Sequence, residues 1–288
     1  MKNKNYKKII NKLIKTIEKN GIPEKIKKWK KPELKYDFKN YDEFHKYIFK
    51  LAKSYDKHTY IINQKREQAY CKKHNINTDN DRKKPTIKRL KNKILHLKFY
   101  HYYNDYNNDW GKQLDQWVKE VKHQIDKELE KDLNAIIINL SQHHGGNMWP
   151  AIRAMINIYG KTTLLRFTSE KNWINLVNHK EKGGQFMTNE IKFKKPIHII
   201  VSEKTASSGE IIAASFKGRK NTYFYGHQTN KSGGFLSSNQ GFFIDDKKNI
   251  NLILTTSLIQ SVDKKIYNKE ILRVRKYDNP IKAIIDKY

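Results

Sequence analysis

Apolar residues recur along this chain in two spacings that predict different elements. Residues 5–19, 41–54 and 112–132 carry apolar side chains at every third or fourth position, which is the spacing of one face of an α-helix. Residues 94–100, 135–140 and 197–201 are short and rich in apolar residues, which predicts strands. The continuous run at 135–140 is typical of a strand covered on both faces. The pattern therefore predicts an α/β fold.

Two of the predicted strands each lead through a short turn into a helix. The strand at 135–140 is followed by a glycine-containing turn at 141–150 and a helix at 151–159, with Pro150 suited to the first helical turn. The strand at 197–201 is followed by the turn at 205–210 and a helical pattern that begins at Ile211. Both turns would lie at the carboxyl edge of an open sheet, where ligands bind in such folds.

The remaining segments predict shorter elements and connections. Residues 223–226, 242–244 and 251–256 read as short strands, and residues 280–287 as a short helix. Polar stretches at 71–92, 101–108 and 229–239 predict connecting loops.

Net charge changes the range of partners to consider. The 288 residues include 59 Lys and Arg against 29 Asp and Glu, a formal net charge of +30. Such a charge attracts nucleic acid, anionic membrane surfaces and acidic proteins. Lys, Asn, Ile and Tyr are all abundant, however, so an AT-rich genome would give the same bias, and the basic residues are spread along the chain. We favour this compositional explanation, because a binding footprint should cluster on one face or segment.

The basic amphipathic helix at 5–19 has two interpretations. It would lie on a membrane surface, or it would pack its apolar stripe against the body of the protein, and we favour packing. The chain has no apolar run of about 18 residues, so no transmembrane helix is expected. The first 20 residues lack a continuous apolar segment, so no signal peptide is expected either. The expected location is the cytoplasm or the site of synthesis.

The turn Thr205-Ala206-Ser207-Ser208-Gly209-Glu210 carries the clearest candidate chemistry. A serine at the start of a helix faces free backbone N–H groups and the positive end of the helix dipole, which favour a developing negative charge. Ser207 is therefore a candidate nucleophile for acyl transfer. Taken alone, the turn fits better with Thr and Ser residues that only cap the helix, and the glycine turn and the His58 turn elsewhere in the chain shift the balance toward a nucleophile.

Histidine and cysteine residues provide few other candidates for a functional site. Asp56-Lys57-His58-Thr59 predicts a turn with a titratable group at its tip. His143 and His144 adjoin the glycine turn, but no HxH or HxxxH partner accompanies them, so no metal site and no cofactor are expected. The single cysteine, Cys71, excludes an intramolecular disulfide and a cysteine-based zinc site.

Several of these stretches together resemble the tail-specific, or C-terminal-processing, serine peptidases. The branch most similar is that of the nisin-resistance proteins, which lacks the PDZ domain. The Ser207 turn resembles the branch's Thr-Ala-Ser-Ser-Ala-Glu motif. Residues 139–150 resemble the family's Asp-Leu-Arg-x-Asn-x-Gly-Gly segment, continued by Asn-Met-Trp-Pro. Residues 56–59 resemble the family's Asp-x-His-Ser/Thr segment. The resemblance spans about residues 40–280. It implies a crotonase/ClpP-like βα core at 93–288 and an N-terminal helical subdomain at 1–92 that carries the catalytic histidine.

The resemblance also implies roles for individual residues. Ser207 would be the nucleophile and His58 the general base, in a serine endopeptidase that cleaves unstructured peptides or protein C-terminal segments. The oxyanion hole would be formed by the backbone of Ser208 and of Gly145 or Gly146, and Glu210 and Asp56 would support the site. Competing bases are His101, His96 and Lys231; Lys231 lies near the position of the lysine that the PDZ-containing branch uses.

This chain departs from the family pattern at four positions. Asn139, Ser141 and His143 replace the family's Asp, Arg and Asn, and Gly209 replaces its second Ala. These departures keep open a second hypothesis, a catalytically degenerate peptidase fold that binds peptides or proteins. A third hypothesis, a nucleic-acid-binding protein, rests on charge alone.

Overall fold

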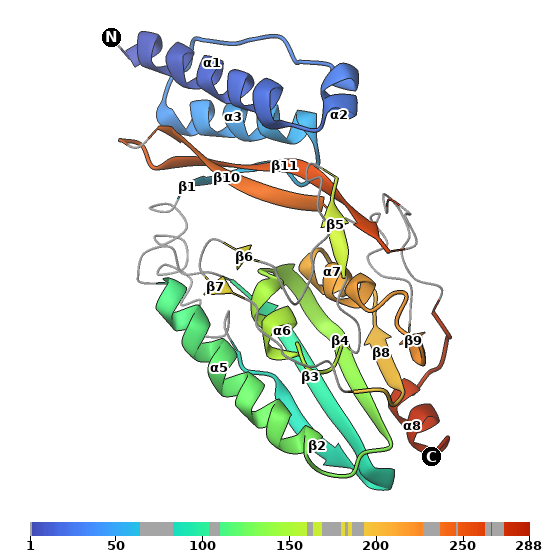
Figure 1. The fold of residues 1–288 in the computed structure, drawn as a ribbon. Coiled ribbons are helices and arrows are strands. Elements are labelled where there is room, and N and C mark those ends of the chain that lie inside the picture. Colours follow the sequence, from blue (N-terminus) through green and yellow to red (C-terminus); the bar gives the residue numbers. More distant parts are fainter. Residues whose placement is uncertain are drawn as a thin grey trace. The chain divides into compact units, whose positions relative to one another are not determined.

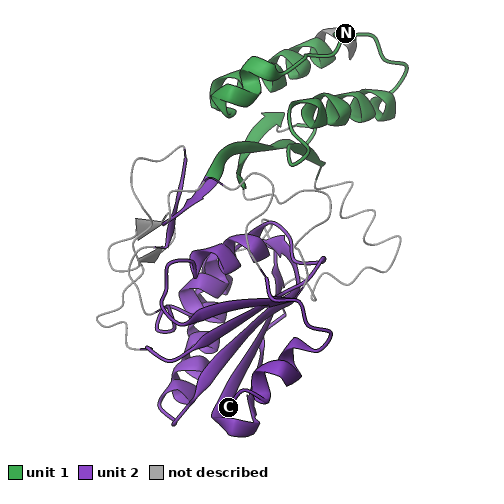
Figure 2. Ribbon diagram, turned by 90° about the vertical axis from the view of Figure 1, so that its right-hand side faces the viewer, with its two compact units in different colours: residues 1–78, 237–258 green, residues 79–236, 259–288 purple. Residues whose placement is uncertain are grey.

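The structure is a computed structural model, and it describes residues 2–63, 83–103, 110–159, 164–168, 180–181, 184–185, 193–226, 237–245, 247–262, 266 and 274–288. The chain forms two compact units (Figure 2). The first unit comprises residues 1–78 and 237–258, and the second comprises residues 79–236 and 259–288. We expected a single boundary at residue 92. The first unit instead ends at residue 78 and also includes residues 237–258.

The second unit is built on a five-stranded sheet (Figure 1). Its strand order is β2-β3-β4-β8-β9, with bounds Thr86–Leu90, Ile94–Tyr102, Ala135–Gly146, Ile197–Val201 and Thr222–Gly226. Strands β3, β4, β8 and β9 are parallel, and β2 pairs antiparallel with β3. Helices α5 (Trp110–Leu129), α6 (Trp149–Ala154) and α7 (Ser208–Ser215) lie in this unit, as does the C-terminal α8 (Pro280–Ile285).

Alternate residues of the central strands enter two different cores. Ile136, Ile138 and Leu140 of β4 pack in the larger core with residues of α5, α6 and α7. Ala135 and Ile137 face the opposite side and pack with Ile284 of α8. Burial on both faces explains why β4 and β8 are apolar without alternation, as is usual for parallel strands between helical layers.

The first unit pairs helices with a separate sheet. Helices α1 (Lys2–Asn20) and α3 (Tyr41–Tyr55) share a core with β1 (Tyr60–Asn63) and β11 (Ile250–Ser261), and a short α2 (Pro23–Lys28) follows α1. Strand β11 pairs antiparallel with β1 on one side and with β10 (Ser237–Asp245) on the other. Beyond residue 258, β11 continues into the second unit and pairs with β5 (Leu165–Phe167). The two-residue strands β6 (Lys180–Glu181) and β7 (Gly184–Gln185) pair with each other.

The sequence pattern misplaced four boundaries. Residues 86–90, expected within a connection, form β2, whose half-buried and exposed positions give no apolar alternation. Residues 141–146, expected to begin the glycine-containing turn, belong to β4, which continues through Gly146. The helix expected at 151–159 covers Trp149–Ala154, and residues 237–239, expected in a loop, begin β10. The extensions of β4 and β10 and the formation of β2 depend on pairing with neighbouring strands, which the local pattern does not contain.

The stripe of α1 is packed, as favoured. Ile10, Leu13 and Ile17 are fully buried in the core of the first unit. Within the described part of the chain, no helix has both the length and the hydrophobicity needed to cross a membrane.

Candidate functional site

Ser207 occupies a strained position at the start of α7. It is the N-cap residue, with φ 51° and ψ −116°. A positive φ is unfavourable for a residue that has a Cβ, so the surrounding structure must hold Ser207 in this conformation. The side chain is half-buried, whereas Ser208, Gly209 and Glu210 are buried. A serine held on a sharp strand-to-helix turn is the geometry of a nucleophile elbow.

The loop between β8 and α7 is tied to the extended end of β4. Thr205 Oγ1 donates to Leu140 O at 2.8 Å, and the backbone N–H of Ala206 donates to His143 O at 3.1 Å. Ser202 Oγ donates to Ser141 O at 2.7 Å. These bonds follow the parallel pairing of β4 with β8 past the last ladder pair, so the loop that carries Ser207 cannot shift relative to β4 without losing them.

Gly145 adjoins the Ser207 side chain. A Cβ built on Gly145 would lie 3.9 Å from Ser207 Oγ and 3.4 Å from Ser207 Cβ. Gly145 and Gly146 have φ values of 131° and 94°, which side-chain-bearing residues rarely adopt. A Cβ on Gly146 would lie 2.2 Å from Tyr102 O, so β3 also requires glycine there. The structure therefore brings the glycine pair and Ser207 to the same edge of the sheet.

Glu210 and Ser208 complete the start of α7. The carboxylate of Glu210, fully buried, accepts a hydrogen bond from the backbone N–H of Ser207 at 3.0 Å. Glu210 thus supports the turn from the N3 position, as in a capping box. Among the described residues, the buried hydroxyl of Ser208 has no hydrogen-bond partner. The side chain of Ser208 is therefore not what anchors the turn.

The residues that depart from the family pattern lie around this turn. Asn139 Oδ1 accepts from Ser141 N at 3.0 Å, and Asn139 Nδ2 lies 3.3 Å from His96 Nε2. His143 packs against the start of α7, where a Cβ on Gly209 would lie 2.7 Å from His143 O and 3.0 Å from His143 Nδ1. The histidine at 143 and the glycine at 209 are thus sterically matched.

The histidines near the glycine pair are not equivalent. Burial lowers the pKa of His143 to about 3, and the charges of His101 and His144 act in the same direction. The rings of His101 and His144 lie 5.8 Å apart, and His144 Nδ1 is 3.2 Å from Lys204 O. Burial is also the first cause of a lowered pKa at His96. In the described part of the chain, no group of three or more His, Cys, Asp or Glu side chains is arranged to hold a metal ion.

His58 lies in the first unit, on the turn between α3 and β1. Asp56 Oδ1 accepts from the backbone N–H of His58 at 2.9 Å, and Asp56 also forms a salt bridge with Lys25. Thr255 Oγ1 donates to Asp56 Oδ1 at 2.9 Å, and Asn239 Nδ2 donates to His58 O at 3.2 Å. Strands β10 and β11 therefore hold the His58 turn, which explains why residues 237–258 belong to the first unit.

The imidazole of His58 is half-buried. Burial lowers its pKa to about 4, while the nearby Asp56 carboxylate raises it. A neutral imidazole at neutral pH is able to accept a proton, which a general base must do. The Asp56 carboxylate itself has a lowered pKa: burial raises it, but the bonds from Lys25, His58 and Thr255 outweigh that effect.

Sequence reasoning missed the partners that hold the His58 turn. Lys25, Asn239 and Thr255 are polar residues on other elements, and nothing in the sequence pattern connects them to this turn. The only sequence signal for the turn was the Asp56-x-His58 spacing, which permits a local turn. Lys231 and Cys71 lie outside the described residues. Ser207 and His58 belong to different compact units.

Three comparisons place the chain among known proteins. The model of peptidase family S41 matches residues 97–275, well over half of the chain. The nisin-resistance protein of Lactococcus lactis subsp. lactis is 26% identical over 161 residues, which are 53% of this chain and 49% of that protein. The chain thus spans about half the length of this relative.

Solved structures share the fold. A lipoprotein from Streptococcus agalactiae is 21% identical with a TM-score of 0.75, and the alignment covers 100% of this chain and 96% of that one. A candidate peptidase from Parabacteroides merdae ATCC 43184 is 14% identical with a TM-score of 0.53, covering 92% and 88% of the two chains. The mixed α/β fold is therefore shared with both. With the family match over residues 97–275, the chain belongs to peptidase family S41, the serine peptidases that its motifs resemble.

Proposed function

We propose that this chain is a serine endopeptidase that hydrolyses unstructured peptides or protein C-terminal segments, with Ser207 as nucleophile and His58 as general base. The observation that carries the proposal is the backbone of Ser207, held at φ 51° at the start of α7 beside Gly145. Ser207 and Glu210 form a capping box at the start of α7. An ordinary N-cap residue has an extended backbone, so capping does not explain the positive φ of Ser207, whereas such strain is typical of catalytic nucleophiles on a strand-to-helix turn.

The proposed reaction proceeds in two steps. Ser207 Oγ attacks the peptide carbonyl carbon while His58 accepts the hydroxyl proton, and the C–N bond breaks as His58 returns that proton to the leaving amine. Water then hydrolyses the acyl-enzyme with His58 again as base. Burial keeps the His58 ring neutral before the reaction, and its pKa of about 4 makes it a weaker base than an ordinary histidine, so the role rests on the Asp56-x-His58 motif.

The negative charge on the tetrahedral intermediate needs hydrogen-bond donors. We assign the backbone N–H of Ser208, at the first position of α7, and one from Gly145 or Gly146. Proximity supports this assignment, since a side-chain atom at Gly145 would touch Ser207. One such donor contributes roughly a hundred- to a thousand-fold in rate.

The residues assigned in this proposal belong to both units. Ser207 and the assigned oxyanion-hole donors belong to the second unit, for which we propose a crotonase/ClpP-like core, and His58 belongs to the first unit. His101 and Lys231 remain alternative bases. Specificity for protein C-terminal segments is a further expectation of the same hypothesis.

The proposal is tested by peptide hydrolysis with purified protein, read by mass spectrometry, on a panel of unstructured peptides that includes nisin. We expect Ser207→Ala and His58→Ala to lose at least a hundred-fold in kcat/KM while the far-ultraviolet circular dichroism stays unchanged. Ser208→Ala is the matched control: its hydroxyl is buried without a partner among the described residues, and only its N–H is assigned a role, so activity should remain. Full activity of Ser207→Ala would refute the mechanism.

A second function is favoured by the changed residues around the site. With Asn139, Ser141 and His143 in place of the family's residues, the fold would bind peptides without cleaving them. Inertness of the unmodified protein, together with peptide binding that is equal in the wild type and Ser207→Ala, would favour this binding module over the peptidase.

A further inference from the structure

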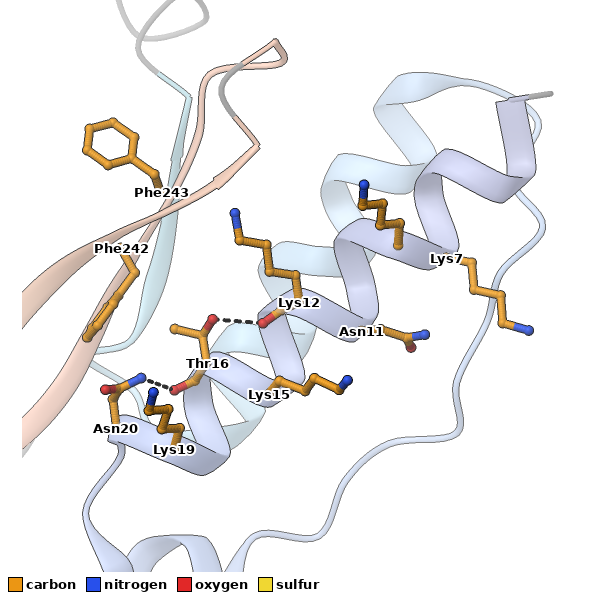
Figure 3. Close-up of a pocket in the computed structure, with 10 residues that line it drawn as sticks. Lys7, Asn11, Lys12, Lys15, Thr16, Lys19, Asn20, Phe242 and Phe243 are labelled. Carbon is orange, nitrogen blue, oxygen red and sulfur yellow. Dashed lines mark hydrogen bonds between the residues drawn. The ribbon is translucent and has the colours of Figure 1, made fainter.

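A row of lysines follows one side of α1 in the first unit. Lys7, Lys8, Lys12, Lys15 and Lys19 line a shallow cavity of about 850 Å³, which Phe242 and Phe243 of β10 also line (Figure 3). We call these five lysines and Phe243 the basic face. Its location does not overlap with Ser207 or with the His58 turn.

The lysines of the basic face are available to a partner. The opposite side of α1 is buried through Ile10, Leu13 and Ile17, so these five lysine residues are exposed. Among the described residues, none of the five forms a salt bridge, and Glu18 on the same helix pairs with Lys31. An unneutralised row of positive charge on one helical face is the local clustering that a footprint for an anionic partner requires.

Two of the three neutral polar side chains that line this cavity, those of Thr16 and Asn20 but not that of Asn11, are engaged within α1. Thr16 Oγ1 donates to Lys12 O at 2.8 Å, and Asn20 Nδ2 donates to Thr16 O at 2.9 Å (Figure 3). Both side chains therefore serve α1 itself. The remaining charged groups are lysines, which act as point charges, rather than arginines, which bind phosphate or carboxylate in a fixed fork.

Phe243 adds an apolar group beside the charges. Its side chain is 72% exposed, whereas Phe242 packs partly into the core of the first unit. An exposed aromatic ring beside lysines is the composition of a peripheral membrane contact, where rings enter the interface and ammonium groups contact headgroups. The lysines alone would also attract a nucleic acid or an acidic protein, and it is the exposed ring beside them that favours a lipid surface.

We propose that the basic face docks this protein peripherally on a membrane surface rich in anionic lipid. The apolar stripe of α1 takes no part, because it is already buried. Binding would combine the attraction of the lysines for phosphate headgroups with shallow insertion of Phe243.

The test is co-sedimentation of the full chain with vesicles of phosphatidylcholine alone and of phosphatidylcholine with 30% phosphatidylglycerol. We expect binding only to the anionic vesicles, weakening as salt rises. Lys12→Gln/Lys15→Gln should weaken it by roughly fivefold per lysine, and Phe243→Ser should weaken it further at constant charge. The matched control is Lys27→Gln/Lys28→Gln, which removes the same charge from exposed positions of α2.

Two outcomes would overturn the proposal. An equal loss of binding in the α2 control would mean that binding follows net charge alone. Equal affinity for anionic vesicles, polyglutamate and single-stranded DNA, with no effect of Phe243→Ser, would assign the face to soluble polyanions instead. Because Ser207→Ala should bind vesicles like the wild type, failure of this proposal is distinguishable from failure of the peptidase assignment.

Discussion

Close contacts at residues 143 and 209 determine the geometry around Ser207. Gly209 stands where the resembling family has alanine, and the space for a methyl group is filled by His143. His143 itself stands where that family has asparagine. The closest contact of a Cβ at 209 would be the backbone oxygen of residue 143 at 2.7 Å, followed by the imidazole at 3.0 Å, so both the path of β4 and the side chain at 143 leave room only for glycine at 209. A sequence without its structure shows both substitutions but not their contact.

Gly209→Ala should be destabilising and should impair catalysis. The new Cβ would lie 2.7 Å from a backbone oxygen of β4, so α7 or the end of β4 must shift. We expect a loss of about 1–3 kcal/mol in the free energy of unfolding, measured by urea titration, and a fall in kcat larger than any change in KM. Gly111→Ala, where a Cβ would meet nothing within 4 Å, is the matched control. An unchanged kcat in Gly209→Ala would mean that this packing does not position the nucleophile.

Strain at Ser207 gives a second prediction at this scale. Glycine tolerates φ 51° without steric cost, whereas alanine does not. Ser207→Gly should therefore unfold at higher urea concentration than Ser207→Ala, by about 1 kcal/mol in the free energy of unfolding. If the two inactive variants are equally stable, the serine is not under backbone strain.

At the scale of elements, the His58 turn depends on strands far away in sequence. Asp56 closes the turn through its backbone bond to His58, but Thr255 and Asn239 bind the turn to β11 and β10. The turn is therefore positioned by a sheet and not by the helix that precedes it.

Thr255→Val tests this support without changing shape. The variant removes the hydroxyl that donates to Asp56 and leaves a buried acceptor with one bond fewer. We expect a loss of roughly 1–2 kcal/mol in stability and a clear fall in kcat. Thr255→Ser keeps the hydroxyl and should retain most of both, whereas a Thr255→Val variant as stable and as active as the wild type would mean that this bond does not support the turn.

The burial of His58 predicts the acid limb of the activity profile. With its pKa near 4, the imidazole stays neutral and able to accept a proton well below pH 6.5. The kcat/KM should remain level from pH 7 to about pH 5 and fall only near pH 4. An acid limb centred at pH 6 to 7 would indicate either that His58 is not the base or that it becomes solvent-exposed in the working enzyme.

At the scale of the whole molecule, several buried histidines make stability depend on pH. Burial lowers the pKa to about 3 for His143 and to about 4 for His58 and His198, against an ordinary value of 6.5. His198 is fully buried, and its ring nitrogens lie 3.1 Å from Tyr225 Oη and 2.8 Å from Tyr288 Oη. Below pH 6.5 the unfolded chain binds more protons at these positions than the folded chain does.

Acidification should therefore destabilise the protein in a defined window. The full stability is present above pH 6.5 and is lost as the pH falls toward 4, with a slope of up to about 1.4 kcal/mol per pH unit for each such histidine. Urea midpoints measured between pH 7.5 and 4.5 should show this decline, and His198→Phe should show a shallower one. An identical slope in His198→Phe would mean that His198 is protonated in the folded state.

The sequence by itself determined the local units of this protein. The apolar run of β8, the small residues that follow it and the helical pattern of α7 predicted a serine at a helix start, because steric preference and short-range hydrogen bonding act between near neighbours. The motif order also indicated peptidase family S41, which the family match confirmed. The spacing of α1 predicted a helix with an apolar stripe, and the structure confirms packing, the interpretation that we favoured over a membrane surface.

Only the tertiary structure decided which local units meet. Parallel pairing of β4 with β8 brings Gly145 to Ser207 across more than sixty residues, and antiparallel pairing returns residues 237–258 to the His58 turn. The edge strand β2 and the beginning of β10, at residues 237–239, were missed because their polar residues carry no apolar period and pairing alone makes them strands. Long-range hydrogen bonds and steric fits such as His143 against Gly209 depend on the folded chain, so no local pattern encodes them.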